Sequence, residues 1–424
     1  MEAQFYAVLW QLERTQWWAP ERLRANQLLQ LSHVVKHAAQ HAPAYKNRLA
    51  HLVDLPPGTL DEDAFRSIPI LSRADAVKAG KRLQSKAPPK AHGAPMDMTT
   101  SGSSGNPFRF TRTQLDGLMS AAMVHRNHLW QERDMTQSMV AVGRLDGNPE
   151  GRREGWAQFF QTGPAYQIDI RRPADEILHK ICEYGCAYLG IWPSLLAEVL
   201  RLSAQLDLRP IGLQSVSTYG EMVQPGLADL CDEVWGAKLI DGYSCEEIGP
   251  LAQQCPHGSY HVHAERVLLE VLDDDDNPCQ VGETGRVVVS SLHSFSRPVL
   301  GMEMGDLGAV GGACACGRGL PVLERIEGRV RDMLTLPGGR KVLPTFDEKA
   351  ITDAAPGLVQ YQLVPGQGGD VTVRYMAGNL LSKVQEAALS RALNSGIGHE
   401  FAYQFERVER ITQTAGRKHR QWVG

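Results

Sequence analysis

The feature that most constrains this chain is a short segment rich in serine, threonine and glycine, Thr99–Pro107. Because glycine tolerates backbone conformations that other residues avoid, such a segment can turn its N–H groups and hydroxyls toward one point, where a polyphosphate would fit. The segment has neither the lysine nor the spacing of a Walker A loop. Asn106 stands where a G-x-S-x-G nucleophile elbow has its second glycine. A phosphate-binding loop and a flexible Ser/Gly linker are therefore the two interpretations of this segment.

Composition indicates a globular protein with more than one domain. The chain has 424 residues, of which 43% are hydrophobic and 22% charged, and its formal net charge is −4. No basic stripe supports nucleic-acid binding, and no apolar run approaches the ~18 residues of a membrane helix. The 8 cysteines, without a signal-peptide pattern, indicate reduced thiols or metal ligands rather than disulfides. We therefore expect a cytoplasmic protein with no integral membrane segment, for which a homodimer is an open alternative.

The middle of the chain alternates strands and helices as a parallel sheet does. Val216–Glu221 and Lys238–Tyr243 are strand-like and are separated by a helical stretch, and ligands of such sheets lie beyond the strand ends. Val140–Gly155 is rich in glycine and charge and is predicted to be a loop. Further on, Arg266–Leu272 and Gly285–Ser291 alternate as β-strands.

The last part of the chain is predicted to be a small α+β unit. Strands are expected near Leu358–Val364, Asp370–Tyr375 and Phe401–Val408, with a helix over Ser382–Leu393, which fits a β-α-β-β-α-β module. We thus predict an α/β protein. Its large, multi-subdomain N-terminal domain with parallel-type sheets would span residues 1–328, and a mobile α+β C-terminal domain would span residues 329–424.

Six short motifs follow one another along the chain: Thr99–Pro107, Tyr219–Glu221, Asp241–Gly249, Met304–Asp306, Arg325–Asp332 and Thr414–Lys418. Each is weak alone. In this order they resemble the acyl-adenylate-forming (acyl-CoA synthetase-like) superfamily, specifically its phenylacetate–CoA ligase-like branch, over nearly the whole chain.

The resemblance implies which residues bind ATP. In that family the first motif holds the phosphates, here Thr100, Ser101, Gly102, Ser103, Ser104 and Gly105. The adenine pocket would be formed by Tyr219, Gly220, Glu221, Asp241 and Tyr243, with the Tyr243 ring packed on adenine. Asp306 would bind both ribose hydroxyls, because a carboxylate can accept two hydrogen bonds.

The resemblance also implies a magnesium ligand. Glu247 would reach Mg²⁺, which accepts one protein carboxylate together with phosphate oxygens, and Glu246 competes for this role. Two departures from the family pattern affect the pocket. Phe108–Arg109 stands where a lysine usually follows the loop, and Gly301–Glu303 replaces the arginine or tyrosine that commonly precedes the ribose-binding aspartate.

The C-terminal motifs imply the remaining catalytic groups. Arg329 would approach phosphate or ribose, and Asp332 would be the pivot about which the C-terminal domain rotates. Lys418 would serve adenylation, although Arg417 directly follows the motif glycine and is the alternative.

The family activity is then the expected one. An acid, aryl or arylacetic by analogy, would be activated by ATP to acyl-AMP with release of pyrophosphate and passed to a thiol, coenzyme A first of all. Trp156, Phe159, Phe160 and Tyr166 could form an aromatic pocket, although aromatic clusters more often belong to a core. Two alternatives stay open: transfer of the acyl group to an amine, and a degenerate nucleotide-binding protein without turnover.

A second site is indicated by the cysteines. Cys255, His261, Cys314 and Cys316 offer the three thiolates and one imidazole of a structural zinc site. His257 or His263 could replace His261, and buried cysteines without a metal are the alternative. Cys182, Cys186, Cys231, Cys245 and Cys279 are interpreted as packing or surface residues.

Overall fold

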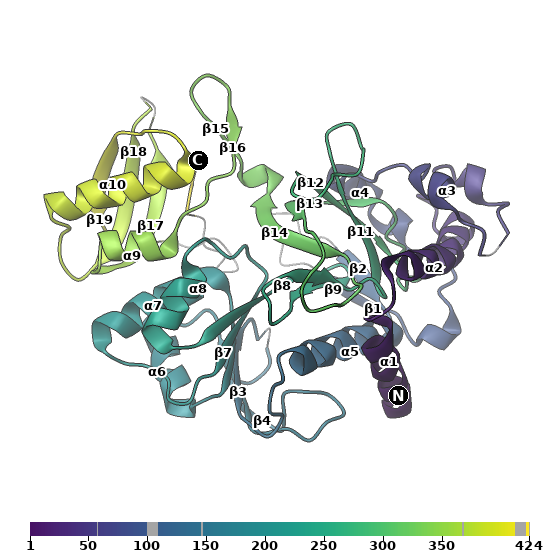
Figure 1. Cartoon of the computed structure of the whole chain (residues 1–424), viewed down its shortest axis with the longest axis horizontal. Helices are drawn as coiled ribbons and strands as arrows, with labels where there is room; N and C mark the ends of the chain where they lie inside the picture. The colour runs from purple at the N-terminus through teal and green to yellow at the C-terminus, as the bar shows by residue number, and fades with distance from the viewer. Residues whose placement is uncertain (57, 100–108, 146, 367–368, 412–420, 424) are drawn as a thin grey trace. The chain divides into compact units, whose positions relative to one another are not determined.

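Two structural units, each assembled from separate stretches of the chain, form the computed structural model (Figure 1). The structure describes residues 1–56, 58–99, 109–145, 147–366, 369–411 and 421–423. Unit 1 comprises Met1–Arg133, Ala157–Phe159 and Gly242–Val330, and unit 2 comprises Asp134–Trp156, Phe160–Asp241 and Arg331–Gly424.

Unit 1 contains five α-helices among the described residues, and several of them begin at recognisable sequence signals. They are α1 (Glu2–Thr15), α2 (Pro20–His41), α3 (Glu62–Arg66), α4 (Arg73–Ala79) and α5 (Gln114–Trp130). Pro20 is the first residue of α2, where its missing N–H costs no hydrogen bond. A capping box of Thr113 and Asp116 begins α5. The apolar face of α2 lies in the same core as strand residues of this unit.

The strands of unit 1 form an antiparallel sheet and a separate hairpin. The sheet runs in the order β11 (Val267–Leu272), β12 (Thr284–Ser291), β13 (Met302–Val310), β14 (Val322–Arg329), β10 (Tyr260–Val262), β9 (Gly249–Gln254), followed by the last residues of β8 (Lys238–Cys245). β11 and β12 confirm the strands predicted at 266–272 and 285–291, although most of their residues are buried and do not alternate with exposed ones. The hairpin joins β1 (Met96–Thr99) to β2 (Arg109–Arg112).

Unit 2 contains the predicted parallel sheet. Its strands follow the order β7 (Ser215–Tyr219), β6 (Tyr188–Ile191), β3 (Met139–Gly143), β5 (Ala165–Asp169), all parallel, with β4 (Gly151–Arg153) antiparallel at the edge. Helices α6 (Ala174–Tyr184), α7 (Pro193–Leu206) and α8 (Leu227–Trp235) share its core. The prediction of a loop over 140–155 is wrong at its ends, because the buried Val140 and Val142 make β3 a central strand.

The C-terminal part of unit 2 is the expected small α+β module. It consists of a short hairpin, β15 (Leu334–Thr335) and β16 (Lys341–Val342), then α9 (Glu348–Ala354), β17 (Leu358–Pro365), β18 (Val371–Ala377), α10 (Lys383–Ile397) and β19 (Tyr403–Arg407). β17 pairs antiparallel and β19 parallel with β18. Among the described helices, none is long and apolar enough to cross a membrane.

Candidate functional site

Part of the predicted site lies outside the described residues, namely Thr100–Gly105 and Lys418. The strands on either side of the first of these segments are described. In the β1–β2 hairpin, Thr99 pairs with Arg109. The chain therefore enters and leaves the predicted phosphate segment on two neighbouring strands.

Three of the predicted site residues meet in unit 1, although they come from three separate motifs. The Tyr243 hydroxyl, on β8, donates to Asp306 Oδ2, on β13, at 2.7 Å. Arg329 Nε, on β14, lies 3.4 Å from Asp306 Oδ1, and the two residues are direct partners in the β13–β14 ladder. Burial, followed by the neighbouring Asp306 carboxylate, raises the pKa of Tyr243 well above its usual value. The phenol is therefore a neutral donor at any working pH.

Glu247 lies in the turn between β8 and β9. Its side chain is 7% exposed, and Oε1 is 3.5 Å from Arg73 Nη1, the first residue of α4. Glu246, its neighbour in the same turn, is exposed. The buried position and the charged partner favour Glu247 over Glu246 as the functional acid.

Of the predicted adenine residues of unit 2, Tyr219, Gly220 and Glu221 lie at or just beyond the carboxyl end of β7, where parallel sheets bind ligands, and Asp241 lies on β8. Thr218 donates to Asp241 Oδ1 at 2.6 Å, and the Tyr219 hydroxyl donates to the Val142 carbonyl at 3.1 Å. Glu221 Oε2 accepts a hydrogen bond from the Ser194 N–H at the start of α7, where the helix dipole favours a carboxylate.

Gly220 follows β7 with φ +80°, and an added Cβ would lie 3.6 Å from the Trp192 indole nitrogen. The predicted pivot, Asp332, is exposed and lies 3.8 Å from Arg331.

Two of the predicted pocket aromatics have core-type partners of their own. Phe159 packs on Phe5 in unit 1, and Tyr166 stacks on Tyr184 in unit 2. This favours the core interpretation for both rings.

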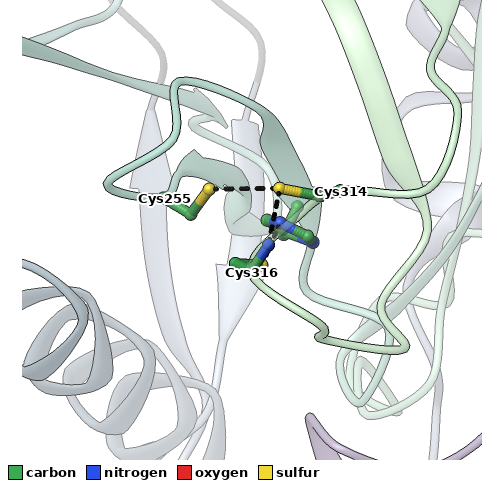
Figure 2. Close-up of side chains that lie close together, drawn as sticks. Cys255, Cys314 and Cys316 are labelled. Atoms are coloured by element: carbon green, nitrogen blue, oxygen red, sulfur yellow. Dashed lines mark hydrogen bonds between the residues drawn. The ribbon is translucent and has the colours of Figure 1, made fainter.

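The four predicted metal ligands come together in unit 1 (Figure 2). The ligand atoms of Cys255, His261, Cys314 and Cys316 all lie within 4.8 Å of one another. Cys255 Sγ is 3.6 Å from Cys314 Sγ, and Cys316 Sγ is 3.2 Å from His261 Nε2. Ligand–ligand separations in tetrahedral zinc sites follow from metal–ligand bonds of about 2.0–2.3 Å and are about 3.3–3.8 Å. Burial lowers the pKa of His261 to about 4, so the imidazole is neutral, as a metal ligand must be.

The alternative histidines have other surroundings. His257 is exposed, and His263 Nδ1 is 2.8 Å from Arg126 Nη2. The cluster therefore selects His261 among the three.

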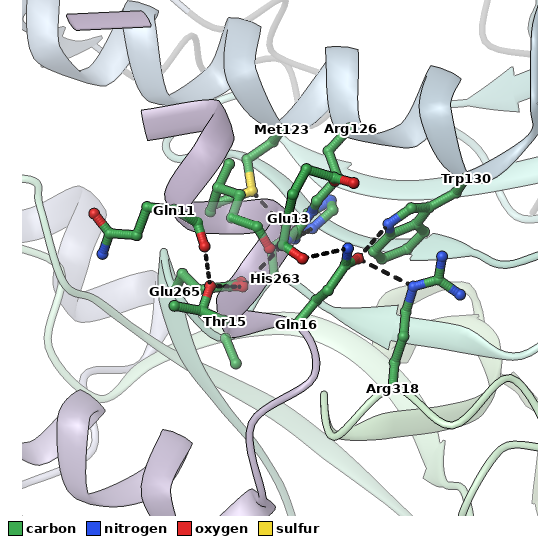
Figure 3. Close-up of polar contacts among 12 residues, drawn as sticks. Gln11, Glu13, Thr15, Gln16, Met123, Arg126, Trp130, His263, Glu265 and Arg318 are labelled. Atoms are coloured by element: carbon green, nitrogen blue, oxygen red, sulfur yellow. Dashed lines mark hydrogen bonds and ion pairs between the residues drawn. The ribbon is translucent and has the colours of Figure 1, made fainter. Parts of the chain in front are cut away.

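A buried polar network connects the region of these cysteines to α1 and α5 (Figure 3). Arg126 Nη1 donates to Glu265 Oε1 at 2.8 Å, and Thr15 donates to the same oxygen at 2.7 Å. Gln16 Oε1 accepts from Trp130 Nε1 at 2.6 Å and from Arg318 Nε at 3.1 Å. Because Arg318 lies two residues beyond Cys316, this network anchors the cysteine segment to the helices.

Sequence reasoning did not find several charged residues around Glu247. Arg73 forms the ion pair described above, and Arg112 and Arg266 contact the backbone of the same turn. Arginines are common, and these three lie far from the turn in sequence. No motif or spacing could have indicated them.

Solved acid–CoA ligases share this fold. 2-Hydroxyisobutyryl-CoA ligase in the postadenylation state with 2-HIB-AMP has a TM-score of 0.76 at 19% identity, covering 94% of this chain and 88% of that one. The same ligase with 2-HIB-AMP and CoA in the thioesterification state has a TM-score of 0.62 at 19% identity, covering 97% and 91%. The anthranilate CoA ligase AuaEII with anthranoyl-AMP has a TM-score of 0.55 at 19% identity, covering 76% and 65%.

No protein-family model matches the chain, and no curated protein matches it in sequence. The structural likeness confirms the predicted fold, a large α/β part with a small α+β module. Activity does not follow from a fold alone and depends on the residues of the site.

Proposed function

We propose that this protein is an AMP-forming acid–thiol ligase. It would activate a carboxylic acid with ATP to acyl-AMP and pass the acyl group to a thiol, coenzyme A first of all. The observation that carries the proposal is the convergence of Tyr243, Asp306 and Arg329. Three motifs that were matched separately in sequence supply one carboxylate, one phenol and one guanidinium to the same place, on a fold that acid–CoA ligases share.

In the first half-reaction the acid carboxylate attacks the α-phosphorus of ATP. A carboxylate–phosphorus bond forms and the bond to pyrophosphate breaks. Asp306 would accept hydrogen bonds from the ribose diol, while Tyr243 and Arg329 hold the carboxylate in place. In the second half-reaction the sulfur attacks the acyl carbon, AMP leaves, and the thiol proton passes to solvent.

The surroundings of Glu247 suit a metal-bound polyphosphate. Its Oε1 is buried, and although it forms the ion pair with Arg73 at 3.5 Å it has no hydrogen-bond partner among the described residues. It could therefore bind Mg²⁺, which when bound would neutralise phosphate charge. The buried Arg297 interacts electrostatically with Glu247. Burial lowers the pKa of Arg297 to about 10, which leaves it charged near neutral pH. Fixed cations of this kind stabilise the charge that develops on the phosphate oxygens.

Several finer assignments belong to the same proposal. The acid would be aryl or arylacetic, as in the phenylacetate–CoA ligase-like branch. Residues 329–424 would form the mobile domain that turns about Asp332 between the half-reactions. Thr100–Gly105 would hold the phosphates, with Tyr219 and Gly220 at the adenine, and Lys418 would act in adenylation. The protein would work in the cytoplasm.

The second proposed site is a structural zinc centre formed by Cys255, His261, Cys314 and Cys316. The donor set fits zinc, because three thiols and one neutral imidazole lie within 4.8 Å of one another, and the Cys255–Cys314 and Cys316–His261 distances of 3.6 and 3.2 Å are close to those of a tetrahedral ion. We expect no catalysis from it, since all four coordination positions would be filled by protein.

ATP–pyrophosphate exchange across a panel of aryl, arylacetic, short aliphatic and amino acids tests the function. Glu247→Ala and Asp306→Ala should abolish the exchange that one acid supports, whereas the matched control Glu246→Ala should retain it. Exchange that persists in both variants would contradict the assigned roles. ATP binding without exchange for any acid would identify a protein without turnover, and acyl transfer to amines but not to coenzyme A would identify an amide ligase.

A further inference from the structure

Two arginines hold the turn that carries Glu247 from either side. Arg112 Nη2, at the end of β2, donates to the Glu246 carbonyl at 2.9 Å. Arg266, between β10 and β11, donates to the Ile248 carbonyl. The peptide group that precedes Glu247 and the one that follows Ile248 are thus each held by a charged donor, and such hydrogen bonds are stronger than those between neutral groups.

Both guanidinium groups are packed closely against this turn. Gly249 follows it with φ +109°, and an added Cβ would lie 3.2 Å from Arg112 Nη2 and 3.4 Å from Arg266 Nη2. The same Cβ would lie 3.0 Å from Ser120 Oγ. Any other residue here would therefore have to displace Ser120 and Arg112 and to adopt a φ that glycine tolerates best. Arg266 is 2% exposed, and burying a charged group is costly unless it is paired with a hydrogen-bonding partner.

The two arginines leave the Glu247 carboxylate available for binding a metal ion. Neither arginine has a hydrogen bond to that carboxylate among the described contacts. Both act on the backbone carbonyls instead. Arg112 Nε and Arg266 Nε are also buried without hydrogen-bond partners in the described part of the chain. Each arginine thus hydrogen-bonds to the backbone of the turn although its own Nε stays without a hydrogen-bond partner.

We propose that Arg112 and Arg266 are positioning residues that fix Glu247 for binding the metal complex of ATP. Arg112 would in addition couple this turn to the strand that follows the phosphate segment, because it lies on β2 and contacts the Glu246 carbonyl. The proposal rests on the proposed function of Glu247. It is tested by metal binding, which does not depend on turnover.

The test uses Arg112→Met and the conservative Arg112→Lys. Binding of Mn²⁺·ATP is followed by electron paramagnetic resonance, and pyrophosphate exchange is followed as a function of Mg²⁺ concentration. Loss of a residue that orients a metal ligand typically weakens metal affinity about 10–100-fold. We expect Arg112→Met to weaken Mn²⁺·ATP binding at least ~10-fold, Arg112→Lys to restore part of it, and the KM for the acid to stay unchanged.

The matched control is Arg340→Met. Arg340 also donates to the carbonyl of a turn residue, Gly398, at 2.6 Å, but it lies in the C-terminal module and has no described contact with Glu247 or its turn, so metal binding should not change. In a Glu247→Ala background, Arg112→Met should have no further effect, since two residues that act through one carboxylate are not additive.

Unchanged Mn²⁺·ATP binding in Arg112→Met would overturn the proposal. So would a loss of binding in the Glu247→Ala background as large as in the wild type, because Arg112 would then act on the phosphates directly. If the wild type exchanges pyrophosphate with no acid, the proposed function fails. The Mn²⁺·ATP comparison still decides the role of Arg112. A wild type that binds no Mn²⁺·ATP overturns both.

Discussion

Arg126 is a fully buried arginine whose charge is matched inside the protein by Glu265. Their side chains are 0% and 5% exposed, and Nη1 lies 2.8 Å from Oε1. Replacing both charged groups of such a pair by apolar residues is often tolerated, whereas removing one leaves the other buried without a partner. Because this pair joins α5 to the segment before β11, its removal tests how much it contributes to the stability of unit 1.

Glu265→Ala should therefore lower the free energy of unfolding by about 3–5 kcal/mol, measured by urea denaturation. As a control, Glu406→Ala removes one partner of the exposed Arg374–Glu406 pair and should change stability by less than about 1 kcal/mol. Equal effects of the two substitutions would contradict a structural role for the buried pair.

His128 predicts an acid sensitivity. Burial, followed by the neighbouring Arg133 charge, lowers the pKa of His128 to about 3, whereas in the unfolded chain it is about 6.5. Below the pKa that His128 has in the unfolded chain, the unfolded chain binds a proton that the folded protein does not bind. The free energy of unfolding therefore falls by about 1.4 kcal/mol for each pH unit.

His128→Asn should reduce the pH slope of stability by about 1.4 kcal/mol per pH unit between about pH 6 and pH 4, while it keeps an acceptor for Arg133, whose Nη1 lies 3.0 Å from His128 Nδ1. Other buried histidines with lowered pKa values, such as His261 and His263, account for a remaining slope. The measurement is the free energy of unfolding in urea at several pH values for both proteins. Parallel curves for variant and wild type would show that His128 is not the group responsible.

At this scale the sequence predicts residue types better than residue partners. The cysteine and histidine cluster could be found because thiolates and imidazole have few other reasons to occur together, and the motif residues Tyr243 and Asp306 because their neighbours match a pattern. Arg112 and Arg266 could not, since an arginine that contacts a distant backbone carbonyl leaves no trace in local sequence. Such contacts depend on tertiary packing alone.

At the scale of elements, the candidate zinc centre would link the β9–β10 hairpin to the connection between β13 and β14. Cys255 follows β9, His261 lies on β10, and Cys314 and Cys316 lie in the connection between β13 and β14. Because a metal binds only the folded arrangement, its removal should destabilise unit 1, and free zinc at a thousand times its Kd stabilises by about 4 kcal/mol.

We therefore expect about one zinc ion per chain by mass spectrometry of the purified protein, and a lower melting temperature after chelation. Cys316→Ser should lose the ion. Cys279→Ser, which changes a half-buried thiol of the same unit outside the cluster, should keep it. A wild type without zinc that is unaffected by chelators would favour the alternative of packed thiols.

Elements were predictable where local pattern and tertiary context agree. The strand–helix–strand of β7, α8 and β8 was found because apolar strand-like segments flank a helical stretch, and β11 and β12 were found because runs of valine and leucine are separated by an acidic turn. β3 was missed because glycines and charges follow it closely. Its central place in the sheet comes from pairing with β5 and β6, which lie later in the chain.

At the scale of the whole molecule, the two units combine stretches that a linear reading separates. Residues 331–424 belong to the same unit as 134–156 and 160–241, because helices α7 and α9 are joined by contacts that no local pattern encodes. The domain boundary at 328/329 stays a prediction, and so does the movement of the C-terminal part. One buried contact makes that movement testable.

Arg201 on α7 forms an ion pair with Glu348 on α9, and their side chains are 4% and 3% exposed. Gln421 Nε2 donates to Glu348 Oε1 at 2.7 Å and to the Tyr361 hydroxyl at 2.8 Å. The last described residues of the chain are thus held by the same carboxylate. If the C-terminal module turns away between half-reactions, this pair must open. The pair then stabilises one of the two arrangements and not the other.

Glu348→Gln weakens the pair but keeps an acceptor for Gln421 and nearly the same volume. If the paired arrangement is the one that forms acyl-AMP, pyrophosphate exchange should fall at least ~10-fold, which corresponds to about 1.4 kcal/mol. Thioester formation from supplied acyl-AMP should then be unchanged or faster. The unequal response of the two half-reactions is the signature, because a substitution that merely damaged the fold would slow both together.

Glu233→Gln, which affects the exposed Lys349–Glu233 contact beside it, should alter neither step. A fall in thioester formation alone would assign the pair to the other arrangement, and equal losses in both steps would show that α7 and α9 stay together throughout the reaction.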